Sequence, residues 1–337
     1  MTAKCRHIHR VPVLPPRAAD AHKGTFGRVL IVGGSVGMAG APALAGLAAL
    51  RSGAGLATIA VPESVQPSVA IMCPCATTVP LPETRDGRID PPAAERRLKK
   101  LGLLGVPPDG ARPDVVAIGP GVGRGPATYG TQFWQLIEAI RRLGVPAVID
   151  ADALNLAPQG GLEAAKGWQH FDHARTVITP HPGELARLLE TSIAQIQADR
   201  EGHAIRTAQA MRANSSPDGS PPVVVLKGAA TIVTDGELVY TNNSGNPGMA
   251  TGGSGDVLTG MIAALIGQGM TPFDAAIAGV YFHGLAGDLA AKRLGQVSMI
   301  ATDIIDALPE AFQKKPRRGL GQPIPAAQAG TPEHYRA

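Results

Sequence analysis

A glycine-rich stretch, SGNPGMATGGSGDVLTGMIAALIGQG (244–269), combines the features of a phosphate site with one acidic residue. Gly252, Gly253 and Gly255 allow successive N–H groups to point toward the start of the apolar helix predicted from Asp256 onward. Such a nest binds anions, most often phosphate. An acid beside phosphate repels it, so Asp256 suits a base that takes a proton from a group attacking phosphorus. The alternative is that Asp256 is only a favourable charge at a helix start.

A second group of polar residues lies at other predicted element boundaries. His181 and Glu184 are three residues apart at a helix start. Glu184 could hold a divalent cation that bridges phosphates, and His181 could hydrogen-bond a substrate. The alternative is that Pro182 and Glu184 only begin the helix. Lys227 follows an apolar strand and could meet a nucleotide, although a solvated lysine at a strand end is equally expected.

Two aspartates follow another predicted strand. Asp150 and Asp152 have one residue between them. In an extended chain they point to opposite faces, so we expect at most one to face the site. Asn155 could cap the chain locally.

The familiar nucleotide signatures are missing from the sequence. Walker A requires a Gly-Lys pair, which the chain lacks, and no strand is followed by G-x-G-x-x-G. The segment 33–37 fits G-x-S-x-G and would make Ser35 a hydrolase nucleophile. A loop through which a ligand approaches the backbone explains the same glycines better. The residues therefore indicate phosphoryl transfer without a P-loop, and they do not identify the substrate.

These residues need a scaffold that brings strand ends together. Short apolar strands alternate with helices, an Asp235-Gly236 turn indicates a hairpin, and the chain is helical from Asp256 to about Leu308. This alternation predicts an α/β protein with a mostly parallel sheet covered on both faces. Ligands bind such sheets at the carboxyl ends of the strands, where the polar and glycine residues gather. The predicted strands are 28–32, 56–61, 115–118, 147–149, 176–179 and 223–226.

Composition limits the partners and the compartment. The formal charge of +4 is concentrated in residues 1–22 and 313–337, which we expect to be flexible tails of one domain at 23–312. The body is therefore acidic, and no nucleic-acid partner is expected. Three cysteines, two in a C-P-C, favour a reducing compartment, and no apolar run predicts a signal peptide or membrane span. We expect a cytoplasmic protein with a surface excursion at 84–112.

Six motifs follow one another along the chain. They are HKGTFGRVLIVGGSVGMAGAPALAG (22–46), GPGVGR (119–124), VIDADALNL (148–156), TPHPGE (179–184), LKGAAT (226–231) and NPGMATGGSGDVLTG (246–260). Together they resemble the ribokinase-like superfamily, and within it they are most similar to the bacterial ADP-dependent NAD(P)H-hydrate dehydratases. The resemblance implies a three-layer sandwich with a mostly parallel central sheet and helices on both faces.

The resemblance also implies a reaction. It is the dehydration of the 6S hydrate of NADH or NADPH (NADHX or NADPHX) to NAD(P)H. ADP, or ATP in its place, is the co-substrate, Mg²⁺ the cofactor, and AMP and phosphate leave. Phosphorylation of the added hydroxyl would turn a poor leaving group into a good one, with Asp256 as the base.

The roles of individual residues are carried over by position. The substrate would contact Asp256 together with Ala41, Gly121, Gly123 and His181. Glu184 matches the metal-associated acid of the superfamily's N-x-x-E motif, whose Asn is His181 here, which departs from the kinases. The nucleotide would contact Lys227, Gly228, Ala229, Ala230, Thr231, Gly252, Gly253, Ser254 and Gly255.

The resemblance further implies a homo-oligomer, and a tetramer is one of the oligomeric states that it allows. Because many relatives carry an epimerase domain, we expect this chain to cooperate with a separate NAD(P)H-hydrate epimerase. Two other functions stay open. One is a small-molecule kinase of the same fold, acting on a vitamin precursor or sugar, and the other is a catalytically silent nucleotide-binding regulator.

Overall fold

The computed structural model describes residues 5–14, 16–104, 112–157, 175–213, 215 and 220–314. Their strands form one ten-stranded sheet in the order β1-β10-β9-β8-β7-β6-β5-β2-β3-β4. Only β9 runs against the others, since it pairs antiparallel with both β8 and β10. The strands are β1 (Arg6–Ile8), β2 (Arg28–Val32), β3 (Leu56–Pro62), β4 (Thr77–Leu81), β5 (Val115–Ile118), β6 (Ala147–Ile149), β7 (Thr176–Ile178), β8 (Val223–Leu226), β9 (Ile232–Thr234) and β10 (Leu238–Thr241).

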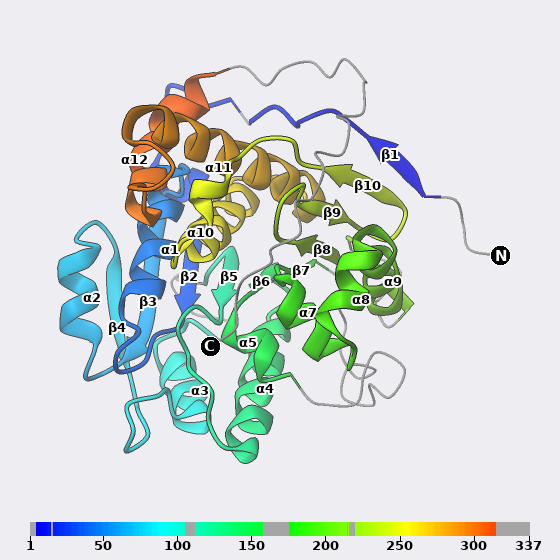
Figure 1. The fold of residues 1–337 in the computed structure, drawn as a ribbon. Helices are drawn as coiled ribbons and strands as arrows, with labels where there is room; N and C mark the ends of the chain where they lie inside the picture. The colour runs from blue at the N-terminus through cyan, green and yellow to red at the C-terminus, as the bar shows by residue number, and fades with distance from the viewer. Residues whose placement is uncertain are drawn as a thin grey trace.

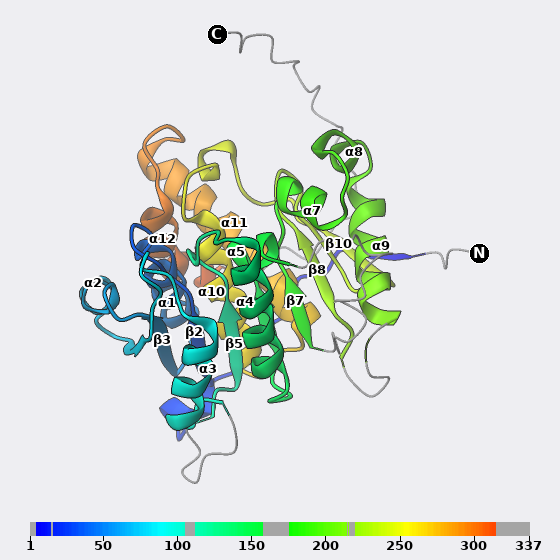
Figure 2. The same ribbon diagram turned by 90° about the horizontal axis from the view of Figure 1, so that it is seen from below.

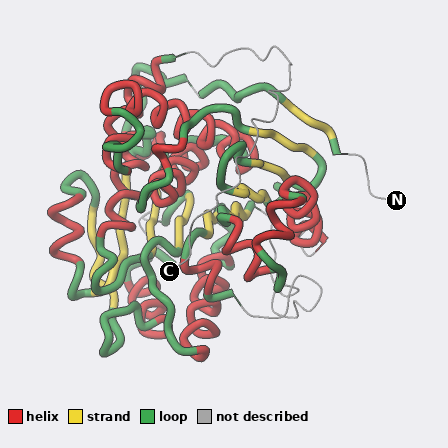
Figure 3. Tube along the Cα trace, viewed as in Figure 1, coloured by secondary structure: helices red, strands yellow, loops and turns green. Residues whose placement is uncertain are grey.

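Helices cover both faces of the sheet, as Figure 1 and the view from below in Figure 2 show. In Figure 3 the yellow strands lie between red helices. The helices are α1 (Gly40–Arg51), α2 (Gln66–Met72), α3 (Pro91–Lys100), α4 (Ala127–Arg141), α5 (Asp152–Asn155), α7 (Pro182–Leu188), α8 (Ile193–Ala198), α9 (Arg200–Ala213), α10 (Ser254–Gly267), α11 (Pro272–Leu294) and α12 (Ala301–Gln313), with short 3₁₀ turns at Lys23–Phe26 and Pro247–Met249.

The alternation of side chains along β2 divides the core into two halves. Val29 and Ile31 pack with α1, α2, α10, α11 and α12, whereas Leu30 and Val32 pack with α3, α4, α5, α7, α8 and α9. Every one of these four side chains is at most 1% exposed. A strand that is apolar on both sides is typical of a parallel sheet between two helix layers. The predicted three-layer α/β sandwich is confirmed.

The strand order reverses beside β2. The chain runs from β2 to β3 and β4 on one side, and then returns to β5 on the other side. The loops that follow β2 and β5 therefore diverge at one point of the sheet edge. Ligands bind doubly wound sheets at such a switch point. The loops in question are Gly33–Ala39 and Gly119–Gly123, and both are glycine-rich.

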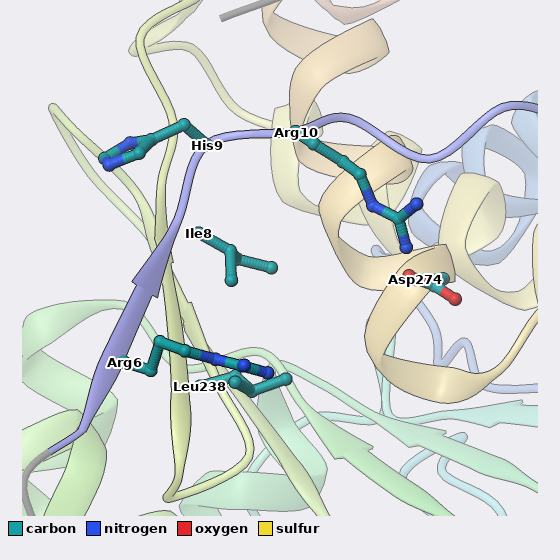
Figure 4. A pocket seen from close by; sticks show the side chains of 6 residues that line it. All are labelled: Arg6, Ile8, His9, Arg10, Leu238 and Asp274. Carbon is teal, nitrogen blue, oxygen red and sulfur yellow. The ribbon is translucent and has the colours of Figure 1, made fainter. Parts of the chain in front are cut away.

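Residues 6–8 do not form part of a flexible tail, so the prediction for 1–22 is wrong there. They form β1, which pairs in parallel with β10. Arg17 is also anchored, because its guanidinium donates to the carbonyl of Gly53 at 2.6 Å. Figure 4 shows the pocket of about 380 Å³ between this segment and α11, lined by Arg6, Ile8, His9, Arg10, Leu238 and Asp274. It lies at the edge where the parallel strands begin, away from the switch point.

Two further expectations need correction. Residues 84–104 are more than a surface excursion: they include α3, and Ile89, Ala94 and Leu98 are fully buried. Residues 105–111 lie outside the described part. The sequence also predicts a helix that opens at Pro62, directly after the strand 56–61. Pro62 instead ends β3, and α2 begins at Gln66. From residue 315 on, the predicted basic tail also lies outside the described residues.

Among the helices that the structure describes, none has the length and apolar character needed to span a bilayer.

Candidate active site

The glycine turn opens α10 in the way that the sequence predicted. Gly253 adopts a left-handed conformation (φ 91°) at the N-cap, and a Cβ there would lie 2.6 Å from Leu44 Cδ1. Only glycine fits both conditions. No side chain among the described residues caps this helix, and the N–H of Ser254 donates to the carbonyl of Thr251 at 3.4 Å. The N–H groups of Gly255 and Asp256 have no such carbonyl partner among the described residues, so they stay available for a ligand. The hydroxyl of Ser254 donates to the carbonyl of Met249 (2.8 Å), and Gly252 is exposed.

Asp256 lies in the first turn of α10 in a half-buried, acidic setting. Burial raises its pKa to about 7, and the nearby carboxylate of Asp150 adds to this effect. Lys227 acts in the opposite direction, while Asp152 and Glu184 raise the pKa further. A carboxylate whose pKa lies near neutrality is poised to accept a proton under physiological conditions. A helix-start acid without another role would keep a low pKa beside the helix dipole.

This pKa leads to a prediction for the pH dependence of activity. The base must be ionised, so kcat/KM should rise as pH increases through about 7 and fall below it. Stability should change in the opposite direction. Because the folded-state pKa of Asp256 is raised, its contribution to stability is present at low pH and is lost as pH rises through about 7. Steady-state rates and thermal melts between pH 5 and pH 9 measure both effects. A rate that does not change over this range would contradict the assignment.

Lys227 forms the centre of a buried ion-pair cluster and is not a solvated residue. Its amine donates to Asp150 Oδ1 at 2.6 Å and lies 3.7 Å from Glu184 Oε2. The lysine side chain is only 18% exposed. Burial lowers its pKa, but Asp150 and Glu184 outweigh this effect and the pKa is raised. Lys227 therefore carries its positive charge at the carboxyl ends of β6 and β8.

Both aspartates after β6 contact predicted site residues, because the chain is not extended between them as the expectation of opposite faces assumed. Ala151 has a left-handed φ of 53°, and the chain turns there into α5. Asp152 consequently accepts a hydrogen bond from the N–H of Gly123 at 2.9 Å. Asp150, 1% exposed, stays beside Lys227. A non-glycine residue in this conformation is often found where function requires strain.

His181 and Glu184 form a reciprocal cap at the start of α7. His181 Nδ1 accepts from the N–H groups of Gly183 and Glu184, and Glu184 Oε2 accepts from the N–H of His181 at 2.7 Å. The helix-initiation reading is therefore confirmed. It does not exclude a role in binding, because the ring is half-exposed and its proton is left on Nε2. Burial, Lys227 and Arg187 lower the pKa of His181, so the ring is a neutral donor.

The structure brings the β2 and β5 loops into contact. A Cβ on Gly121, which has a φ of 67°, would lie 2.7 Å from the carbonyl oxygen of Met38 and 3.0 Å from Ala41 Cβ. A Cβ on Gly123 would lie 3.1 Å from Met38 Cε. The predicted substrate contacts Ala41, Gly121 and Gly123 thus lie close together. Asp152 accepts a hydrogen bond from Gly123 and also raises the pKa of Asp256, so it couples this loop electrostatically to α10.

Ser35 is not a nucleophile. Its hydroxyl donates to the carbonyl of Gly121 at 2.9 Å, and the residue is 2% exposed. We predict that Ser35→Ala lowers the free energy of unfolding by about 1 kcal/mol through the lost hydrogen bond. Denaturant unfolding measures this loss. A fluorophosphonate probe should label neither protein, and labelling of Ser35 in the wild type would restore the hydrolase reading.

The predicted nucleotide segment after β8 is a tight, exposed turn. Thr231 Oγ1 donates to the carbonyl of Gly228 at 2.9 Å, and Ala230 has a left-handed φ of 53°. Gly228 and Ala229 are exposed as well. Arg200, which sequence reasoning missed, supports the turn by donating to the carbonyls of Leu226 and Lys227 at 3.2 and 3.3 Å. Nothing in the local sequence of α9 indicates this contact.

The described residues do not form a dedicated metal cage. They contain no group of three His, Cys, Asp or Glu side chains that could hold an ion. Both oxygens of Glu184 lie near donors, namely the backbone N–H of His181, its ring Nε2 and the Lys227 amine. Mg²⁺ often binds through substrate phosphates and water with only one or two protein carboxylates. The metal-associated role of Glu184 stays a prediction.

The sandwich, its switch point and the nest facing a buried lysine define a ribokinase-like α/β protein, as the motifs predicted. A family model described as NAD(P)H-hydrate dehydratase matches residues 29–310. The chain therefore belongs to the NAD(P)H-hydrate dehydratase family, and the resemblance found in the motifs is confirmed.

Individual relatives agree with this assignment. The chain is 37% identical to the ADP-dependent (S)-NAD(P)H-hydrate dehydratase of Neisseria meningitidis over 88% of both chains. It is 48% identical to the bifunctional NAD(P)H-hydrate repair enzyme Nnr of Moorella thermoacetica, covering 88% of this chain and 51% of that protein. The chain thus spans about half the length of the first such relatives. The ADP/ATP-dependent NAD(P)H-hydrate dehydratase of Bacillus subtilis, co-crystallised with ATP/Mg²⁺, has a TM-score of 0.68 at 30% identity, covering 89% of this chain and 94% of that one.

Proposed function

We propose that this chain dehydrates the S hydrate of NADH or NADPH to NAD(P)H and consumes ADP, or ATP in its place, in doing so. Family membership supports this function. The observation that carries the proposal is Asp256, a carboxyl with a pKa of about 7 in the uncapped first turn of α10, close to the positive charge of Lys227. This arrangement combines a base with an anion site.

The chemistry has two steps. In the first, Asp256 takes the proton of the C6 hydroxyl as its oxygen attacks the terminal phosphorus of ADP, and AMP leaves. The N–H groups of the Gly252–Gly255 turn and the nearby amine of Lys227 would stabilise charge on the transferred group. In the second step the ring nitrogen pushes out phosphate, and a proton is lost from C5. The ring double bond is restored, so no phosphorylated product accumulates.

The other residues would hold the reactants. Lys227, Gly228, Ala229, Ala230 and Thr231 form the exposed turn that would contact the nucleotide. Ala41, Gly121, Gly123 and His181 would contact the hydrated dinucleotide. When bound, Mg²⁺ would neutralise phosphate charge, and we propose that it arrives with the nucleotide because the described acids form no cage for it.

Three broader expectations belong to the same proposal. The protein would act in the cytoplasm, where its substrates are made, and as a homo-oligomer. It would also cooperate with an epimerase. The name of the Neisseria relative specifies the S hydrate, so an epimerase would convert the R hydrate to a form that this reaction can use.

Incubation with purified NADHX and ADP tests the function directly. The near-ultraviolet absorbance of the dihydronicotinamide should return, and AMP and phosphate should form in equal amounts with the NADH. A phosphorylated organic product without recovered absorbance would instead indicate a small-molecule kinase. Nucleotide binding without either reaction would indicate the silent regulator.

A further inference from the structure

The carboxylate of Asp150 is almost completely buried, and both of its oxygens accept hydrogen bonds. The residue ends β6 and is 1% exposed. Its Oδ1 accepts from the Lys227 amine at 2.6 Å, and its Oδ2 accepts from the hydroxyl of Thr259 at 2.7 Å. A buried carboxylate with both oxygens hydrogen-bonded is not available to a ligand. Its influence on a reaction must therefore pass through its neighbours.

The first neighbour is the Lys227 amine, which lies beneath the glycine turn. A Cβ on Gly255 would be 3.3 Å from Lys227 Nζ and 3.9 Å from Asp150 Oδ2. The amine is therefore in close contact with the first turn of α10, one residue before Asp256. A lysine has four flexible carbon–carbon torsions and reaches such a place only when a partner holds it there.

The second neighbour is Thr259 on α10. It is fully buried and lies one turn after Asp256 in the same helix. Its bond to Asp150 ties that turn to the end of β6, while the bond from Lys227 ties β6 to β8. One carboxylate thus joins three segments that are far apart in the chain. All three meet at the candidate phosphate nest.

We propose that Asp150 is a positioning residue. It holds the Lys227 amine and the first turn of α10 in the relative position that phosphoryl transfer requires. The inference rests on the proposed function. Asp150 itself does not touch substrate, and it is distinct from Asp256, which takes the proton. Misplacement of catalytic groups by about 1 Å can cost about 10²-fold in rate.

The charge of Asp150 gives this role a measurable signature. The charged groups acting on Asp256 are Asp150, Lys227, Asp152 and Glu184, which come from four different elements. Asp150 is the largest of these electrostatic contributions, and it raises the pKa of Asp256. Its neutralisation should therefore let Asp256 ionise at lower pH.

The test is Asp150→Asn, which keeps the shape and removes the charge. We expect kcat to fall by about 10- to 100-fold, while the Kd for ADP stays within about threefold of wild type. In the pH profile of kcat/KM, the acidic limb should move to lower pH. The matched control is Asp235→Asn in the β9–β10 turn. Asp235 is also buried (6% exposed), and within the described part of the chain its carboxylate accepts from the backbone N–H groups of Glu237 and Leu238. The control should leave kcat and the profile unchanged. A wild-type kcat and profile in Asp150→Asn, or parallel losses of kcat and ADP binding without a pH shift, would overturn the proposal.

A second variant covers the case in which Asp150→Asn does not fold. Thr259→Val removes one tether and no charge, so kcat should fall severalfold while the acidic limb stays in place. Hydrogen exchange over residues 254–260, measured without substrate, should be faster in both variants than in wild type or Asp235→Asn. Unchanged exchange in Thr259→Val would refute the tether whether or not the wild type dehydrates NADHX, and an unchanged kcat would refute it where the wild type is active. Absence of turnover by the wild type would refute the proposed function alone.

Discussion

Asp256→Asn should lower kcat by about 10²- to 10⁴-fold, the usual contribution of a general base. Asparagine keeps the size and shape of the side chain, but it cannot accept the proton of the attacking hydroxyl. ADP should still bind with unreduced affinity, because the variant removes a negative charge from beside the phosphate nest. Single-turnover rates with NADHX and calorimetric titration with ADP separate the two effects.

The matched control for this variant is Asp274→Asn. Asp274 is the third residue of α11, just as Asp256 is the third residue of α10, so the two acids occupy equivalent positions relative to their helix dipoles. A wild-type rate in Asp274→Asn, together with a large loss in Asp256→Asn, would show that the base matters and the helix-start charge does not. Equal, small losses of kcat in both variants would indicate that Asp256 is only a favourable charge at a helix start.

Stability provides an independent check on the same residue. Ionised Asp256 lies half-buried near other acids, so wild-type stability falls as pH rises through about 7. Asp256→Asn carries no such charge. It should therefore melt at a higher temperature than wild type at pH 8, and the difference should shrink toward pH 4. Loss of activity together with a gain in stability is typical of a site that function keeps strained.

The sequence predicted the central strands well because their signal is local. The predicted ranges for β2, β5, β6 and β8 agree with the structure, since each is a short apolar run followed by glycine or a polar residue. The two strands at the sheet edges were missed. β4 contains Pro80, which weakens a strand pattern and is tolerated only at an edge. β1 is RHI, a polar run whose pairing partner β10 lies far along the chain.

The candidate site shows the same division between local and distant signals. Asp256 and the glycines could be predicted because they follow one another in one turn. The ion pair between Lys227 and Asp150 joins residues 77 apart in the chain. It depends on β6, β7 and β8 being neighbours in the sheet, which no short motif specifies. Arg200 was missed for the same reason, because its partners are carbonyls on β8 and the following loop.

Lys227→Met should destabilise the protein by about 3–5 kcal/mol at pH 8, the usual cost of removing one partner from a buried ion pair. Methionine replaces the stem of the lysine but leaves Asp150 and Glu184 as two uncompensated carboxylates, which are 1% and 4% exposed. Burial already raises the pKa of Glu184, and removal of Lys227 raises it further because the lysine opposes that shift. At pH 5 Glu184 protonates more readily in the variant, so the loss should be smaller than at pH 8. Urea unfolding at the two pH values measures the difference.

Two comparisons show whether this cost arises from the buried charges. Lys292→Met replaces an exposed lysine in the last turn of α11 and should change stability by less than about 0.5 kcal/mol at either pH. Lys227→Arg keeps the charge, but its larger guanidinium must fit beneath Gly255, where a Cβ would already lie 3.3 Å from the lysine amine. This variant should therefore be more stable than Lys227→Met at pH 8 and still lose most of its turnover. If Lys227→Met unfolded like the wild type at pH 8, the lysine would be a solvated strand-end residue and could not organise the phosphate site. A large loss at pH 8 that becomes smaller at pH 5 would instead show that the positive charge of Lys227 holds buried Glu184 in its ionised form.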